Sequence, residues 1–295
     1  MPDGGTPTLD QLRVLATVAE AGSFSAAARR LGRAQSVISY TIANLEAQLG
    51  LTLFARAGRR PELTEAGRAL VADANRVGLL VDELRARAAA LRRGLEAELG
   101  LAVDVMFPTA RLVAALDDFA REYPTVGLRL RIEALGGVAQ LVLDGTCRLG
   151  VSGWTGAVPG ALERRAIGEV LLVPVAAPSH PLARAPRPIP GAVLRDQVQL
   201  VLTDRTTLTA GQEFGVLALR TWRLGDLGAK HALLLAGLGW GNMPEEMVAP
   251  DLESGRLVRL DLAEAPQHRY PISLVHRTDA PPGPAGAWLA ERLAR

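Results

Sequence analysis

The chain has 295 residues, of which 48% are hydrophobic and 22% are charged, a composition typical of a globular protein. It contains no apolar run of about 18 residues, so we expect neither a membrane-spanning segment nor a membrane partner. The first residues lack the basic and apolar regions of a secretory signal, and the single cysteine, Cys147, excludes an intramolecular disulfide. We therefore expect a cytoplasmic protein that holds no metal and no cofactor.

Positive charge is concentrated at the N-terminal end of the chain. Residues 1–95 hold 13 arginines against 9 acidic residues, whereas the remaining residues are slightly acidic. A basic N-terminal third suits contact with nucleic acid, although so small an asymmetry also fits chance.

Three short helices are predicted at the N-terminus, over about 9–21, 25–31 and 35–49. Thr8 and Gln11 have the spacing of a capping box at the start of the first helix. A glycine follows each helix, where it can end the helical run. Two helices joined by a tight glycine-containing turn indicate a helix-turn-helix.

The third helix has one apolar face and one polar face. Its apolar residues form a narrow stripe that must face a core: Ile38, Ile42, Leu45 and Leu49. The other side carries short polar groups able to reach base edges in a major groove: Arg33, Ser36, Ser39 and Tyr40, with Gln35 at the helix start. On periodicity alone, an ordinary solvated helix face is an equally good interpretation.

Residues 9–70 resemble the DNA-binding region of LysR-type transcriptional regulators. The matching pieces are AEAGSFSAAARRL, LEAQLG, LFAR and LTEAG, together with the positions of Gln35 and Ser39. The resemblance implies a winged helix-turn-helix domain over residues 1–63 that binds double-stranded DNA. It further implies base reading by Gln35, Ser36, Ser39 and Tyr40, and phosphate contacts by Arg56, Arg59 and Arg60 from the wing. Ala34 and Tyr40 depart from the family's usual serine and arginine, so operator preference does not transfer.

One long linker helix is predicted from about residue 64 to residue 93, within a linker segment at 64–95. Its apolar residues recur in steps of four and three, the pattern of a coiled-coil seam: Leu70, Ala74, Val77, Val81, Leu84, Ala88 and Leu91. Such a seam favours dimerisation against a second copy, although an amphipathic helix packed on its own domain is the alternative. Two recognition helices in one dimer imply a partly palindromic operator.

Residues 96–295 alternate predicted strands and helices, which indicates a mainly parallel α/β sheet. Strands are expected near 99–107, 127–135, 147–153, 198–204, 220–224 and 270–276. Helices are expected near 111–123, 138–143, 226–238 and 285–295. A proline-rich stretch at 177–190 is predicted to be an exposed connection.

This region resembles the LysR effector domain, on the pieces FAREYP, LVLDGTCRLGV, APSHPLA, AGLGWGNMPEEMV and SGRLVRLDL. The resemblance implies a two-lobed, periplasmic-binding-protein-like α/β domain that binds a small-molecule effector in the cleft. Its lobe I would span about 97–165 plus 268–295, and its lobe II about 166–267. The family also implies self-association as a dimer and a tetramer, and contact with RNA polymerase. Arg148 stands where the family usually has an acidic residue, and neither it nor Cys147 has a predicted role.

Side chains that follow predicted strands are the candidates for the effector cleft, because α/β folds bind ligands at the carboxyl ends of strands. Thr109 lies near a helix N-terminus, where free amides favour an anion. Trp240 and Asn242 are expected in the loop that follows the helix at 226–238. Three tryptophans among the candidates suggest an aromatic lining, although packing in the core is an equally good explanation. The full candidate set is Thr109, Ser152, Trp154, Asp204, Trp222, Trp240 and Asn242.

Two other functions find less support in the sequence. An enzyme fused to a DNA-binding arm would need a catalytic constellation, and the four histidines show no such arrangement and no metal-ligand spacing. A solute-binding module would need a secretion signal. The glycine-rich Gly237–Gly241 segment follows a predicted helix instead of a strand, which argues against a dinucleotide site.

Overall fold

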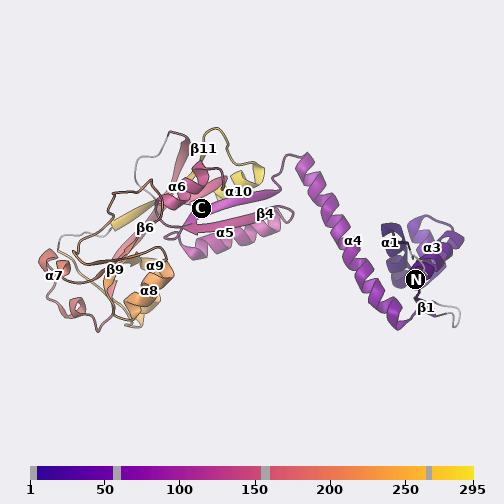
Figure 1. The fold of residues 1–295 in the computed structure, drawn as a ribbon, viewed down its shortest axis with the longest axis horizontal. Coiled ribbons are helices and arrows are strands. Elements are labelled where there is room, and N and C mark those ends of the chain that lie inside the picture. The colour runs from indigo at the N-terminus through magenta and orange to yellow at the C-terminus, as the bar shows by residue number, and fades with distance from the viewer. Residues whose placement is uncertain (1–4, 56–60, 154–159, 264–267) are drawn as a thin grey trace. The chain divides into compact units, whose positions relative to one another are not determined.

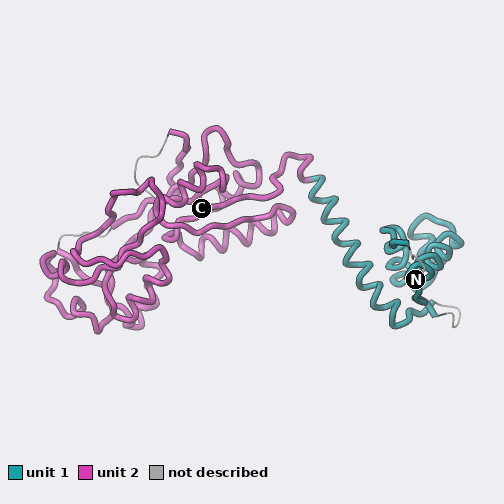
Figure 2. The backbone as a smooth tube through the Cα atoms, in the orientation of Figure 1, with its two compact units in different colours: residues 1–89 teal, residues 90–295 magenta. Residues whose placement is uncertain are grey.

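A computed structural model describes residues 5–55, 61–153, 160–263 and 268–295 of the chain. Contacts divide it into two compact units, Met1–Ala89 and Ala90–Arg295, here called the N-terminal and C-terminal units (Figure 2). The boundary between them falls within the long helix α4 (Glu65–Arg92).

The N-terminal unit contains three short helices, a small hairpin and most of α4 (Figure 1). Its elements before α4 are α1 (Leu9–Ala21), α2 (Phe24–Leu31), α3 (Gln35–Leu49), β1 (Phe54–Ala55) and β2 (Glu62–Leu63). The two strands pair antiparallel. Three helices followed by a hairpin make a winged helix-turn-helix, and the three helix positions agree with those predicted from sequence.

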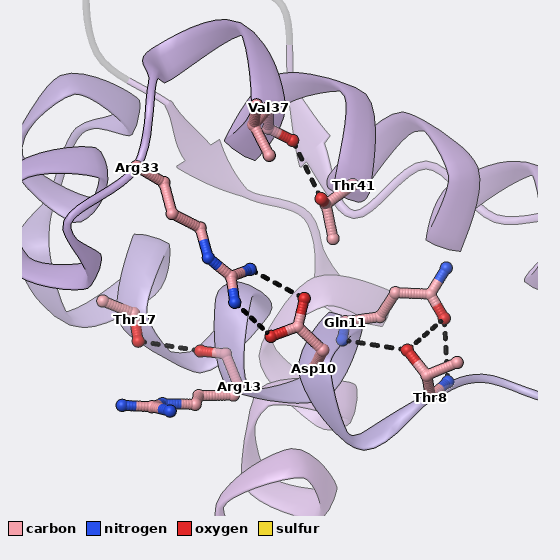
Figure 3. Close-up of polar contacts among 8 residues, drawn as sticks. All are labelled: Thr8, Asp10, Gln11, Arg13, Thr17, Arg33, Val37 and Thr41. Carbon is pink, nitrogen blue, oxygen red and sulfur yellow. Dashed lines mark hydrogen bonds and ion pairs between the residues drawn. The ribbon is translucent and has the colours of Figure 1, made fainter.

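Local capping signals set the ends of these helices. The Thr8 backbone amide donates to Gln11 Oε1 at 2.8 Å, and the Gln11 amide donates to Thr8 Oγ1 at 3.2 Å (Figure 3). This confirms the predicted capping box. Gly22 ends α1 in the left-handed conformation, at a φ of 66°, which glycine adopts without strain.

The apolar stripe of α3 forms the centre of this unit's core. Ile38, Ile42 and Leu45 are buried, as the stripe predicts, and they pack with Val14 and Leu15 of α1. The opposite face of α3 is exposed. The fold of this unit therefore holds α3 by its apolar side and leaves its polar side free.

The predicted seam of α4 divides into two parts. Ala74 is buried in the core of the N-terminal unit and Leu70 is partly buried against that core. The first turns of α4 therefore pack on their own domain, and Ala74 also lines the groove between α1 and α4. Leu84 and Leu91 are exposed, with Leu84 at 67%.

The C-terminal unit is built on one sheet in which the strand order is β4-β3-β5-β11-β6-β9-β7-β8, with β10 pairing to β6. The strands are β3 (Glu98–Asp104), β4 (Gly127–Glu133), β5 (Leu149–Ser152), β6 (Leu162–Ala176), β7 (Gln199–Leu202), β8 (Thr221–Leu224), β9 (Trp240–Pro244), β10 (Val258–Arg259) and β11 (His268–Arg277). The helices are α5 (Thr109–Glu122), α6 (Gly136–Leu143), α7 (Gly191–Arg195), α8 (Leu227–Leu235), α9 (Glu245–Glu253) and α10 (Pro284–Leu293), with a 3-10 turn at Pro181–Arg184.

The sheet is mixed, and the prediction of a mainly parallel sheet is wrong. Parallel pairs occur at each end, where β3 joins β4 and β5, and where β7 joins β8 and β9. Between them, β11 pairs antiparallel with β6 along the whole length of β11, from Leu162 opposite Arg277 to Leu172 opposite His268. These two strands carry the chain from one end of the sheet to the other and back, which gives two α/β lobes. We use lobe I for β3–β5, α5, α6 and α10, and lobe II for β7–β9, α7, α8 and α9.

Aromatic side chains join two helices of lobe I. The ring centroids of Phe119 in α5 and of Tyr123, which caps the end of α5, lie 6.4 and 5.6 Å from the ring centroid of Trp288 on α10. The last helix of the chain therefore packs beside the first helix of this unit, as the returning β11 requires.

Candidate functional sites

The polar face of α3 is open to solvent. The predicted base-reading residues Gln35, Ser36, Ser39 and Tyr40 are all exposed, and Tyr40 reaches 68%. Four exposed polar side chains on the first turns of one helix, opposite a buried stripe, form a surface that can enter a major groove.

Arg33 differs from its neighbours because an acidic side chain already engages it. Its guanidinium donates to both carboxylate oxygens of Asp10 on α1, at 2.7 and 2.8 Å (Figure 3). Hydrogen bonding from Arg33 lowers the pKa of Asp10, and the same pair raises the pKa of Arg33. The pair ties the loop before α3 to α1, so this arginine positions α3 in the structure.

The N-terminus of α3 has no side-chain cap. Ala34 occupies the cap position and makes no side-chain hydrogen bond, because a methyl group cannot accept one. Because the first amides of a helix need acceptors, this end of α3 is able to take a phosphate oxygen. The wing arginines Arg56, Arg59 and Arg60 fall outside the described residues.

The predicted effector residues of lobe I lie where strands end. Thr109 is the first residue of α5 and is exposed, whereas Ser152 is the last residue of β5 and is buried. Trp154 falls outside the described residues. The residue after Ser152 is Gly153, whose amide donates to Asp104, the last residue of β3, which was not among the predicted site residues.

Asp104 is the most buried acidic group described at this end of the sheet. One carboxylate oxygen accepts from the Met106 amide at 2.9 Å, and the other from the Tyr270 hydroxyl at 2.8 Å and the Gly153 amide at 3.3 Å. A Cβ on Gly153 would stand 1.8 Å from the Tyr270 ring, so glycine is required for this approach. Burial raises the pKa of Asp104 to about 6, and burial also raises the pKa of Tyr270.

This raised pKa predicts how stability depends on pH. The folded state holds the Asp104 proton more tightly than the unfolded chain, so the stabilisation is fully present only below the unfolded pKa of 3.8 and is lost as pH rises through 6. Relative to Asp104→Asn, which does not titrate, the wild type should lose roughly 2–2.5 kcal/mol of unfolding free energy between pH 4 and pH 7. Urea unfolding of both proteins across this range measures the difference. A pH-independent difference would contradict the assignment.

The predicted effector residue of lobe II that follows β7 is Asp204. Its carboxylate accepts hydrogen bonds from the Thr206 hydroxyl at 3.0 Å, from the Thr209 hydroxyl, and from the Gly136 amide at 2.7 Å. Asp204 and Gly136 lie 68 positions apart in the chain. The structure thus brings a predicted site residue to the start of α6.

The two described tryptophans of the predicted lining have different surroundings. Trp240 begins β9 and is fully buried against the apolar side chains of Leu182, Ile189 and Leu194. The prediction that Trp240 lies in a loop lining the cleft is wrong, because it begins a strand and apolar side chains enclose its ring. Trp222 lies in β8, an edge strand, and is 46% exposed.

Asn242 also lies within β9, and not in a loop as predicted. Its carbonyl accepts from Lys230 Nζ at 2.7 Å. Lys230 is the only lysine of the chain, and burial lowers its pKa to about 8. Sequence analysis missed Lys230 and Asp104. Two sequence signals were available for finding them. Lys230 is a single lysine among apolar residues of a helix, and Asp104 is an acid at the end of an apolar strand.

Three other features of the described residues bear on function. Cys147 is buried, and burial raises the pKa of its thiol. Within the described ranges, no group of three or more His, Cys, Asp and Glu side chains could hold a metal ion. No helix there is both long and apolar enough to cross a bilayer.

Comparison with known families agrees with this arrangement. Residues 9–68 match the model of the bacterial regulatory helix-turn-helix protein of the lysR family, and residues 92–295 match the LysR substrate binding domain. The chain belongs to the LysR family of transcriptional regulators. It is therefore a DNA-binding regulator with an effector-binding domain, and the family is not one of enzymes.

Curated relatives span most of this LysR-family chain. The probable HTH-type transcriptional regulator YhaJ of Escherichia coli K12 is 31% identical over 257 residues, covering 85% of this chain and 84% of the relative. The HTH-type transcriptional regulator PunR of the same strain is 32% identical over 294 residues, covering 96% and 91%.

Solved structures support the fold. ArgP from Mycobacterium tuberculosis matches with a TM-score of 0.55 and 26% identity, covering 96% of this chain and 95% of that one. LysG from Corynebacterium glutamicum, solved with bound effector Arg, matches with a TM-score of 0.51 and 21% identity, covering 97% of each chain.

Proposed function

We propose that this regulator reads its operator with the exposed face of α3 and senses a small molecule in the cleft between the lobes. The observation that carries the DNA part is the exposure of Gln35, Ser36, Ser39 and Tyr40 on one face of a helix whose other face is buried. Arg56, Arg59 and Arg60 are proposed as phosphate contacts, and Arg33, which also pairs with Asp10, as a further DNA contact.

Gln35→Ala tests base reading. A glutamine can pair bidentately with adenine, so its loss should weaken binding to the operator by roughly 1–3 kcal/mol and leave binding to random DNA nearly unchanged. Fluorescence anisotropy with an operator selected from a random-sequence pool, and with random DNA, measures both affinities. Gln212→Ala is the matched control, since Gln212 is exposed in the C-terminal unit. Equal losses on both kinds of DNA would assign Gln35 to phosphate positioning instead.

The proposed effector site lies at the ends of β3, β5 and β7. It is bounded by Thr109 and Ser152 on lobe I and by Asp204 on lobe II, with Asp104 and Tyr270 beneath. LysG, with its bound effector Arg, provides the precedent of a small molecule in this fold. We include Trp154 in this site on its position in the sequence alone.

Self-association is part of the proposal. A groove of about 670 Å³ runs between α1 and α4 of the N-terminal unit, and its lining mixes apolar and charged side chains: Leu12, Ala16, Val77 and Val81 with Arg13, Asp82 and Arg85 among others. Together with exposed Leu84, it suits the α4 helix of a second copy, and the dimer would read a partly palindromic site. Exposed Ile132 on edge strand β4 and Trp222 on edge strand β8 support further assembly into a tetramer through the effector domains.

Two further parts of the proposal rest on family membership. We propose that the protein acts on genomic DNA in the cytoplasm, and that it activates or represses transcription through contact with RNA polymerase. The helix-turn-helix domain matched at residues 9–68 supports both parts.

A further inference from the structure

One hydrogen bond connects the two lobes of the C-terminal unit at the proposed effector site. Asp204 follows β7 in lobe II, and its Oδ2 atom accepts from the backbone amide of Gly136, the first residue of α6 in lobe I, at 2.7 Å. Helix α6 packs on β3, β5 and β11, and β7 pairs with β8 and β9. The bond therefore joins lobe II to lobe I.

The lobe II side of this contact is held in a fixed orientation. Thr206 donates to the same oxygen of Asp204 at 3.0 Å, and the Thr209 hydroxyl donates to the other oxygen. Thr209 is buried. Two hydroxyl donors on one short segment fix the carboxylate in the orientation that faces α6, so little side-chain freedom is lost when the amide binds.

Lobe I admits this close contact because Gly136 has no side chain. A Cβ added to Gly136 would stand 2.7 Å from Thr206 Oγ1 and 2.9 Å from Asp204 Oδ2, closer than carbon and oxygen atoms pack. The backbone of Gly136 does not require glycine, because its φ is not in the left-handed region. Glycine at this position is thus explained by the approach of lobe II.

Helix α6 also needs an acceptor at this end. Its cap residue, Leu135, provides no side-chain hydrogen bond and holds the backbone at a φ of 49°, which costs energy for a residue with a branched side chain. A carboxylate at a helix N-terminus is favourable because it meets unpaired amides and the positive end of the helix dipole. Asp204 supplies from one lobe the cap that α6 lacks in the other.

We propose that Asp204 is an internal latch, a carboxylate that closes the two lobes on each other with no effector bound. An anionic group of a small molecule reaches the start of α6 only by displacing Asp204, and a ligand that leaves Asp204 in place binds to lobes already closed. A role for this latch in regulation depends on the proposed effector function. The existence of the latch depends only on the contacts between Asp204 and Gly136.

Two variants test the latch from opposite sides. Asp204→Ala removes the acceptor, and Gly136→Ala keeps the acceptor but adds the Cβ that blocks its approach, while alanine is the better helix former. Hydrogen–deuterium exchange of the full-length protein, without DNA or effector and read residue by residue, should show the amide of residue 136 exchanging faster by roughly tenfold or more in both variants. Amides 203–209 should also exchange faster in both, and the double variant should match the single ones.

Asp196→Ala is the matched control, because Asp196 is an exposed acid on lobe II whose removal should change neither region. Circular dichroism establishes that each variant is folded before exchange is compared. Unchanged exchange at residue 136 in Asp204→Ala, or wild-type exchange at 203–209 in Gly136→Ala, would overturn the latch. Since no effector or operator enters the measurement, a failure of the proposed regulatory function leaves this result unaffected.

Discussion

Replacing Trp240 by alanine should lower the free energy of unfolding by about 3–5 kcal/mol, because the change leaves a large cavity in a packed core. Trp240 is fully buried and contacts Leu182, Ile189 and Leu194, which come from the connection between β6 and β7. The indole therefore anchors the proline-rich connection to the sheet of lobe II. Urea unfolding of the variant and the wild type measures the loss.

Two comparisons separate this core role from a role in an effector pocket. Trp240→Phe keeps a ring and removes an indole N–H that has no partner among the described residues, so it should cost less than alanine. Trp222→Ala makes the same deletion at a side chain that is 46% exposed, and should change the stability of lobe II little. Normal stability of Trp240→Ala combined with a lost effector response would restore the pocket interpretation.

The N-terminal unit could be predicted closely because its signals are local. Thr8 and Gln11 are three positions apart, and the stripe from Ile38 to Leu45 spans two helical turns, so neighbouring residues determine each helix end and each face. Such signals do not depend on how distant parts of the chain meet. They place the proposed base-reading residues on an exposed face without any tertiary information.

The effector domain was predicted less completely because its site depends on distant contacts. Asp104 and Tyr270 are 166 positions apart, and Gly136 and Asp204 are 68 apart, so neither pair leaves a sequence pattern. The long strand β6 was not predicted, since its first half holds three charged residues in a row, Glu163 to Arg165, and its second half contains Pro174. Missing β6 also concealed its antiparallel pairing with β11, and so the mixed character of the sheet.

The tryptophans show why a position near the end of a helix or strand is weak evidence for a pocket. Trp240 follows a helix in sequence and was placed in a loop, yet it opens β9 with its ring inside a hydrophobic cluster. Trp222 lies on an edge strand, where half-exposed aromatic rings suit contact with another chain as well as with a ligand. Burial and strand order, which decide between these roles, follow from packing and not from the local sequence.

Placing two charges on the α4 seam should break the proposed dimer and weaken operator binding by a factor of roughly 10²–10⁴. Val81→Asp with Leu84→Asp puts carboxylates into a surface formed by the α1–α4 groove and exposed Leu84. Burying unpaired charges against a second copy is costly, so the copies should separate. A separated pair loses the gain in effective concentration that binding two half-sites on one duplex provides.

Sedimentation velocity and operator titration measure the two effects in the same samples. Ala86→Asp with Ala89→Asp is the matched control, because it adds two acids three residues apart at exposed positions that the helical period turns away from the seam. The control should stay dimeric and bind the operator normally, since its charges remain in water. If the seam variant also stays dimeric, α4 packs only within its own subunit, and the partner contact must lie elsewhere. If it dissociates yet binds the operator as tightly as before, one N-terminal unit suffices for recognition and the palindromic operator loses its support.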